Sequence, residues 1–251
     1  MSARRPLIAG NWKMHETIAG ARALVRELRA RPLAEGVDVA IAPPFTALAA
    51  VCEELAGSAI SLAAQTMHER DSGPYTGEIS PLMLRELGVA YVVLGHSERR
   101  ADCGETDDAV NRKVQAALAH GITPIVAVGE TRDEHVAGDT LRKVTHQTRA
   151  AFAAVPSADV ARCVVAYEPI WAIGSGQSDE PADADRVMGE IRGCTAGLVG
   201  ARILYGGSMN ADNAAALLAQ SNIDGGLIGG ASLSAAGFAA IANCARMRVI
   251  A

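Results

Sequence analysis

Glu168 stands at the end of an apolar segment and is followed at once by a hydrophobic, glycine-ended loop. Residues 163–167 are β-branched and apolar enough to form a buried strand, and the proline after Glu168 removes a backbone donor, which ends that strand. The apolar residues 170–173 would be unfavourable in water, whereas Gly174 suits a segment that moves or approaches a ligand closely. A carboxylate beneath such a loop, here called the lid (residues 169–176), is suited to proton transfer. A capping glutamate before a permanently packed loop is an equally good interpretation of this segment alone.

Composition limits the classes of protein to which the chain can belong. Its 251 residues are 49% hydrophobic, which is ample for one sizeable core, and a net charge of -5 without a basic cluster argues against a nucleic-acid partner. The five cysteines show no metal or redox spacing, and no Gly-x-Gly-x-x-Gly follows the first apolar run, so neither a metal nor another cofactor is expected. The first apolar run is too short for a signal peptide and no run could span a bilayer, which predicts a cytoplasmic protein without a membrane partner.

Short apolar runs alternate with longer amphipathic stretches along the whole chain. The predicted strands are residues 7–10, 37–42, 60–64, 91–95, 123–128, 163–167, 202–205 and 226–228. Helical periodicity covers stretches such as 17–31, 44–56, 105–120 and 141–154. Eight successive βα units without a break in composition favour a parallel closed barrel over a doubly wound sheet. We therefore expect an α/β fold, a single (β/α)8 TIM barrel that spans residues 1–251 as one domain.

Active sites of such barrels lie at the C-terminal ends of the strands, and unusual polar residues follow seven of the predicted strands. These residues include Asn11, Lys13, Gln65, His96, Glu130, Glu168, Ser208, Gly229 and Gly230. Glycine, serine and asparagine are ordinary turn residues at strand ends. A turn does not explain Lys13, His96 and Glu168, which are therefore the candidates for catalysis.

Five segments, in this order and spacing, resemble the triosephosphate isomerase family. They are AGNWKM at 9–14, GHSERR at 95–100, AYEPIWAIGSG at 166–176, LYGGS at 204–208 and GLIGGAS at 226–232. The resemblance covers nearly the whole chain. It implies a cofactor-independent isomerase that interconverts dihydroxyacetone phosphate and D-glyceraldehyde 3-phosphate through an enediolate, in glycolysis and gluconeogenesis. The family is a standard example of tuned acid and base groups and of loop closure.

The resemblance also assigns roles to the residues at the strand ends. Glu168 is implied to be the base that moves a carbon-bound proton, and Lys13 the cation that offsets charge on the substrate. His96 is implied to be a neutral hydrogen-bond donor, and residues 97–100 could continue from it as a helix whose N-terminus disfavours an imidazolium. Asn11 is implied to bind substrate and to support Lys13 and His96.

The substrate phosphate is implied to lie against backbone N–H groups rather than in a cationic pocket. The residues implied to form this phosphate site are Gly174, Ser208, Gly229 and Gly230. The supporting residues are implied to be Ser97 beside Glu168, Glu98 beside Lys13, Glu130 beside Trp171, and Tyr205 beside the lid. Glu130 would hold Trp171 while the lid is open, and Tyr205 and Ser208 would latch the closed lid.

The expected partner is a second copy of the chain. The connection 65–78 is long and rich in turn residues, and such a loop is either floppy or docked. By resemblance it inserts into the neighbouring subunit of a homodimer. The implied contact residues are Gln65, Thr76, which approaches the partner's Asn11, and Glu78, which approaches the partner's Arg99.

Several positions depart from the family pattern. Ala127 replaces a usual cysteine, and Thr66 stands where an asparagine is usual. Gln177, Ser178 and Asp179 replace the usual basic hinge at the end of the lid, which bears on the rate of lid motion and leaves the chemistry unchanged.

Other functions remain open at this stage. A related isomerase of a four-carbon ketose phosphate is the nearest alternative, since small loop changes could accommodate one more hydroxymethyl group. A phosphate-binding barrel without catalysis would not require Lys13, His96 and Glu168 together. A lyase that uses Lys13 as a Schiff base is the least favoured interpretation.

Overall fold

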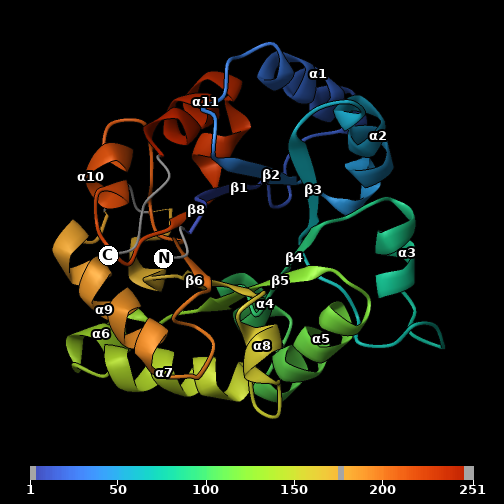
Figure 1. Ribbon diagram of the computed structural model, residues 1–251. Coiled ribbons are helices and arrows are strands. Elements are labelled where there is room, and N and C mark those ends of the chain that lie inside the picture. The colour runs from blue at the N-terminus through green and yellow to red at the C-terminus, as the bar shows by residue number, and fades with distance from the viewer. Residues whose placement is uncertain (1–3, 175–177, 246–251) are drawn as a thin grey trace.

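Within the described residues, 4–174 and 178–245, eight parallel strands form a closed barrel in chain order, with the last strand paired to the first. In this computed structural model the helices surround the barrel (Figure 1). The strands are β1 (Leu7–Asn11), β2 (Asp38–Ala42), β3 (Ile60–Ala64), β4 (Tyr91–Leu94), β5 (Thr123–Val128), β6 (Val164–Tyr167), β7 (Arg202–Tyr205) and β8 (Gly225–Ile228). The eight strand predictions and the barrel are confirmed, with strand boundaries that differ by at most one residue.

The helices lie between the strands, as the alternation of the sequence predicts. They are α1 (Ile18–Arg29), α2 (Phe45–Leu55), α3 (Pro81–Glu86), α4 (Ser97–Asp102), α5 (Asp107–Ala119), α6 (Arg132–Val136), α7 (Thr140–Ala151), α8 (Ser157–Val160), α9 (Pro181–Gly193), α10 (Ala214–Leu218) and α11 (Ala235–Cys244), with short 3-10 helices η1 (Ile170–Ala172) and η2 (Gly230–Leu233). The predicted starts of α1 and α5 come slightly early because Thr17 and Thr106 cap these helices through their side chains. Among the residues that the structure describes, no helix is long and apolar enough to cross a membrane.

Both faces of the strands are buried, which explains why they are continuous apolar runs. Along β1, Leu7 and Ala9 join a cluster with alternate residues of the other strands, and this cluster fills the barrel. Ile8 belongs to the larger cluster that lies between the strands and the helices. The barrel interior is therefore a packed core, and a ligand site is expected at the end of the barrel and not within it.

The N-terminal ends of the strands are joined by a buried ionic network. Asp224, just before β8, accepts hydrogen bonds from Arg192 at 2.6 Å, from Arg4 at 2.7 Å and from the Ile203 backbone at 3.0 Å. Burial lowers the pKa of the Arg192 guanidinium, and the charge of Asp224 opposes that effect. This network connects α9, β7, β8 and the N-terminal segment at the end of the barrel away from the strand-end polar residues.

Asp224→Asn is expected to destabilise the protein by about 3–5 kcal/mol, because the buried Arg192 would lose its counter-charge. Urea unfolding at one fixed protein concentration measures the change. Asp183→Asn is the matched control, since Asp183 and its partner Arg186 are exposed and lie 3.9 Å apart. The control is expected to change stability by less than about 1 kcal/mol. Equal losses in the two variants would contradict a structural role for Asp224.

Candidate active site

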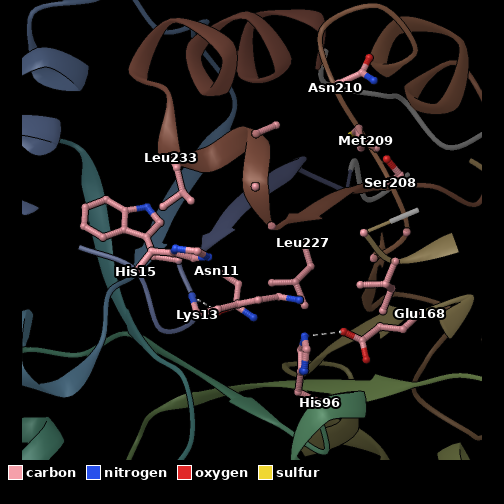
Figure 2. A pocket seen from close by; sticks show the side chains of 18 residues that line it. Asn11, Lys13, His15, His96, Glu168, Ser208, Met209, Asn210, Leu227 and Leu233 are labelled. Carbon is pink, nitrogen blue, oxygen red and sulfur yellow. Dashed lines mark hydrogen bonds and ion pairs between the residues drawn. The ribbon is translucent and has the colours of Figure 1, made fainter. Parts of the chain in front are cut away.

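A cavity of about 410 Å³ opens at the C-terminal ends of the strands. Its lining includes Asn11, Lys13, His96, Glu168, Gly174, Ser208, Gly229 and Gly230, the residues that the sequence analysis assigned to catalysis and substrate binding. Figure 2 shows His96 and Glu168 pointing toward one another, with the side chain of Lys13 extending toward them. Parallel strands in a closed barrel bring these residues together, although they are spread from β1 to β8 in the sequence.

Glu168 is 2% exposed and lies between two donors. Its Oε2 accepts the backbone N–H of Ser97 at 2.9 Å, and its Oε1 lies 3.1 Å from Nε2 of His96. Nδ1 of His96 accepts the backbone N–H of Glu98 at 3.2 Å, so in the neutral ring the proton is on Nε2. His96 therefore caps α4 with one nitrogen and offers a donor to the cavity with the other.

Lys13 has a left-handed backbone, with φ of 52°, which is uncommon for a residue with a side chain. Its backbone N–H donates to Oδ1 of Asn11 at 3.1 Å, and its carbonyl accepts from Gln65 at 2.8 Å. Gln65 also donates to the carbonyl of Ala42 at 2.9 Å, which ties the loop after β1 to the end of β2. These contacts hold the strained backbone that directs the Lys13 side chain.

The ammonium group of Lys13 lies 2.6 Å from Oε1 of Glu98. Burial opposes ionisation of Glu98, but the hydrogen bond from Lys13 and the nearby charges of His96 and Lys13 outweigh it and lower the pKa of Glu98. Glu98 therefore remains a carboxylate near neutral pH and fixes the position of the lysine cation.

Among the described residues of the lid, Ile173 and Gly174 line the cavity. The indole Nε1 of Trp171 donates to Oε1 of Glu130 at 2.8 Å, and the hydroxyl of Tyr167 donates to the same oxygen at 3.2 Å. At the far end, the hydroxyl of Tyr205 accepts the backbone N–H of Asp179 at 3.0 Å. The contact between Trp171 and Glu130, expected for the open lid, is thus present together with a contact of Tyr205, which is expected to latch the closed lid. Ser175, Gly176 and Gln177 lie outside the described residues.

The turn after β8 contributes Gly229 and Gly230 to the cavity. The carbonyl of Gly229 accepts from both the backbone and the hydroxyl of Ser232, at 2.8 and 2.6 Å, which fixes the turn at the start of η2. A Cβ atom placed on Gly230 would meet no atom within 4 Å. The backbone of this turn is therefore accessible from the cavity.

Comparison with known proteins decides the family. A family model described as triosephosphate isomerase matches residues 6–245. A triosephosphate isomerase of Thermoanaerobacter pseudethanolicus is 49% identical over 246 residues, which cover 96% of this chain and 99% of that relative. The chain belongs to the triosephosphate isomerase family. Two further relatives named triosephosphate isomerase are similar: that of Chloroflexus aurantiacus is 51% identical over 243 residues (94% of this chain, 97% of the relative), and that of Moorella thermoacetica is 49% identical over 247 residues (96% and 98%).

The residues that hold the backbone before His96 were not predicted from the sequence. Gly95, with φ of 75°, donates its N–H to Glu105 at 2.8 Å, and its carbonyl accepts from Arg100 at 2.7 Å. Glu105 is in turn paired with Lys113, and both side chains are buried. A signal was present, because Lys113 falls on the apolar face of α5, where a charged residue requires a buried partner.

Three of the departures from the family pattern, Ala127, Thr66 and Asp179, are buried. Ala127 is fully buried on β5, and its carbonyl lies 3.4 Å from the Arg100 guanidinium. Thr66 is 7% exposed, and among the described residues its hydroxyl has no hydrogen-bond partner. In the proposed hinge, Ser178 is exposed and Asp179 is buried. Burial, together with the charge of Asp183, raises the pKa of Asp179.

The residues predicted as dimer contacts are spread over two regions. Thr76 and Glu78 are exposed on the connection between β3 and α3, which projects beyond the ring of helices (Figure 1). Gln65 and Arg99 line a second cavity of about 380 Å³, which also reaches Asn11 and Lys13. In the described ranges, no group of three or more His, Cys, Asp or Glu side chains is arranged to hold a metal ion.

Proposed function

We propose that this chain is a cofactor-independent aldose–ketose isomerase that interconverts dihydroxyacetone phosphate and D-glyceraldehyde 3-phosphate through an enediolate, in glycolysis and gluconeogenesis. The observation that carries the proposal is that Glu168, His96 and Lys13 line one cavity, because binding a phosphate requires none of the three. The family model and the names of the relatives support the same activity. We further propose that residues 1–251 form one barrel domain that works in the cytoplasm, where glycolysis takes place.

Proton transfer between adjacent carbons of the substrate is the task of Glu168. Its buried carboxylate has little water around it, and the Ser97 N–H and His96 hold it at the edge of the cavity. A carboxylate that exchanges these donors for a substrate C–H becomes a stronger base. It removes the proton from one carbon and returns it to the other.

Charge that develops on the substrate oxygens requires donors and a cation. Nε2–H of His96 points into the cavity and donates to these oxygens as a neutral imidazole, since Nδ1 is occupied as an acceptor. The Lys13 ammonium, fixed beside Glu98, offsets the negative charge of both the enediolate and the phosphate. Asn11 stabilises the Lys13 backbone and faces the same cavity.

The phosphate is held by backbone N–H groups that line the cavity. The fixed turn at Gly229 and Gly230, together with Ser208 and the lid residue Gly174, surrounds this part of the cavity. Neutral backbone donors can make the direct contacts to a dianion, while the Lys13 ammonium in the same cavity offsets its charge. Tyr205 anchors the C-terminal end of the lid through Asp179, so that Gly174 remains at the cavity when the lid closes.

A coupled assay tests the proposed reaction. The purified protein is supplied with D-glyceraldehyde 3-phosphate, and the dihydroxyacetone phosphate formed is reduced by an NADH-linked dehydrogenase. A four-carbon ketose phosphate is tested in parallel, although the names of the relatives do not favour it. A kcat/KM that is higher for the three-carbon substrate supports the proposal. Preference for the four-carbon substrate, or no turnover of either, would overturn it.

We propose that the protein works as a homodimer. The second cavity is lined by Asn11, Lys13 and His96, and Met14, which also lines it, is 94% exposed. A second copy that covers this side chain and the cavity beside it would remove apolar surface from water. By the family resemblance, the loop 65–78 of a second copy would occupy this position, with Thr76 approaching Asn11 and Glu78 approaching Arg99.

Thr76→Arg combined with Glu78→Arg is expected to give monomers, because unpaired charges are unfavourable in a desolvated interface. Isomerase activity is expected to fall at least tenfold, as Asn11 and Lys13 lose their outer support. Light scattering and the coupled assay measure the two effects. The charge-matched control, Ala158→Arg with Glu190→Arg, changes exposed positions on α8 and α9 and is expected to remain dimeric. Fully active monomers would show that the site does not depend on a partner.

A further inference from the structure

His135, on the short helix α6, stacks against the lid. The centroid of its ring lies 4.6 Å from a ring centroid of Trp171, and the ring planes are inclined by 34°. Its Nδ1 lies 3.6 Å from Oε1 of Glu130, the same oxygen that accepts the indole N–H of Trp171 at 2.8 Å. The lid tryptophan is therefore held by a buried carboxylate and an imidazole together.

The helix that carries His135 is fixed in place. Thr131 and Glu134 form a reciprocal capping box at the start of α6. The carboxylate of Glu134 also lies 2.9 Å from the ammonium of Lys143 on α7, which fastens α6 to its neighbour. The position of the His135 ring relative to Glu130 is thus set by the scaffold, while its side chain, 45% exposed, can exchange a proton with water.

Buried acids surround this imidazole. Glu130 is fully buried, and among the described residues its Oε2 has no hydrogen-bond partner. Burial raises the pKa of Glu130, and the charge of His135 acts in the opposite direction; the same holds for Asp179 just beyond the lid. Other titratable and charged groups on the described elements around this cluster include Tyr167 on β6, Arg132, Asp133 and Glu134 on α6, Lys143 on α7, Asp183 and Arg186 on α9, and Tyr205 on β7, whose hydroxyl accepts the backbone N–H of Asp179.

We infer that His135 is a positioning residue for the lid, and that its imidazolium holds Trp171 on Glu130 more firmly than the neutral ring does. A cation on an aromatic face and beside a carboxylate is attracted to both. The inference rests on the isomerase activity proposed above and on the expectation from the sequence that Glu130 holds Trp171 while the lid is open. Protonation of His135 therefore stabilises the lid as it stands here and opposes closure.

Two substitutions separate the charge from the ring. His135→Phe keeps an aromatic partner for Trp171 without a charge, and His135→Arg keeps the charge at every pH. We expect the kcat/KM of the parent, divided by that of His135→Phe, to be about two- to fivefold lower at pH 5.5 than at pH 8.5. A change of this size corresponds to the free energy of a partly exposed cation–aromatic contact. The ratio of His135→Arg to His135→Phe is expected to stay low at both pH values.

Ratios cancel the titrations that all variants share, such as that of the substrate phosphate. The matched control is His146→Phe, because His146 is an exposed histidine 3.7 Å from Asp107 and away from the lid. Its ratio to the parent is expected to be independent of pH. A parent to His135→Phe ratio that does not change with pH would overturn the inference.

A spectroscopic measurement tests the contact without turnover. The chain has two tryptophans, and the indole N–H signal of Trp171 is identified by its loss in Trp171→Phe. The position of this signal is expected to change with pH in the parent, and this pH-dependent change is expected to be absent in His135→Phe. An unchanged step in His135→Phe would assign the titration to Glu130 or Asp179 and refute the inference. If the parent does not turn over triose phosphates, the proposed function fails, and this measurement still decides the role of His135.

Discussion

Glu168→Asp is expected to lower kcat by about a hundredfold or more and to leave KM close to that of the parent. Shortening the side chain by one methylene withdraws the carboxylate from the substrate carbon, while the phosphate contacts at Gly229 and Gly230 are untouched. The Glu168 carboxylate lies 2.9 Å from the Ser97 backbone nitrogen and 3.1 Å from His96 Nε2. The shorter aspartate side chain would also have to make these two contacts. Steady-state kinetics in the coupled assay measure the change.

The control for this prediction is the stability of the variant. Loss of one buried methylene is expected to lower the free energy of unfolding by about 1 kcal/mol, too little to unfold the protein. Glu168→Gln, which keeps the size and removes the charge, is expected to be less active still. A kcat for Glu168→Asp equal to that of the parent would remove Glu168 from the role of base.

Lys13→Met is expected to reduce kcat/KM by at least about a hundredfold, since the developing oxyanion and the phosphate lose their cation. Methionine keeps most of the apolar stem, so packing around the side chain is preserved. The Glu98 carboxylate that loses its partner has a side chain 52% exposed, and water replaces the lysine there. The loss is therefore expected in the kinetics and not in the unfolding transition.

Lys13→Gly and Lys13→Ala separate the backbone from the side chain at this position. Both remove the cation and are expected to be about equally inactive. Because φ of residue 13 is 52°, Lys13→Gly is expected to be about 1 kcal/mol more stable than Lys13→Ala. Unchanged kcat/KM in Lys13→Met would contradict the role of the cation, and equal stabilities of the glycine and alanine variants would contradict strain at this residue.

The strands and the barrel could be predicted from the sequence because their signals are local. Strands buried on both faces, such as β5 and β6, must be continuous apolar runs, and helices that cover them must repeat apolar residues every three or four positions. The sequence also identified Lys13, His96 and Glu168 as candidates for catalysis, since each follows a predicted strand at a position where an ordinary turn residue would suffice. Their convergence on one cavity follows from closure of a parallel barrel.

Contacts between distant positions could not be predicted in the same way. The sequence indicated neither that Glu105 and Lys113 hold Gly95, nor that Asp224 pairs with Arg192, since each buried charge could have had several partners. The left-handed backbone of Lys13 was hidden for the same reason, because strain at one residue persists only when residues elsewhere, here Asn11 and Gln65, hold it.

The sequence by itself determined the order of the elements, the apolar core and the residue types available at the strand ends. Only the tertiary structure decided the proton position on His96, the support of Lys13 by Gln65, and the contact of His135 with Trp171. The physical reason is range. Secondary structure and burial follow from neighbours along the chain, whereas hydrogen bonds and charge pairs depend on a few ångströms between residues that only the closed barrel brings together.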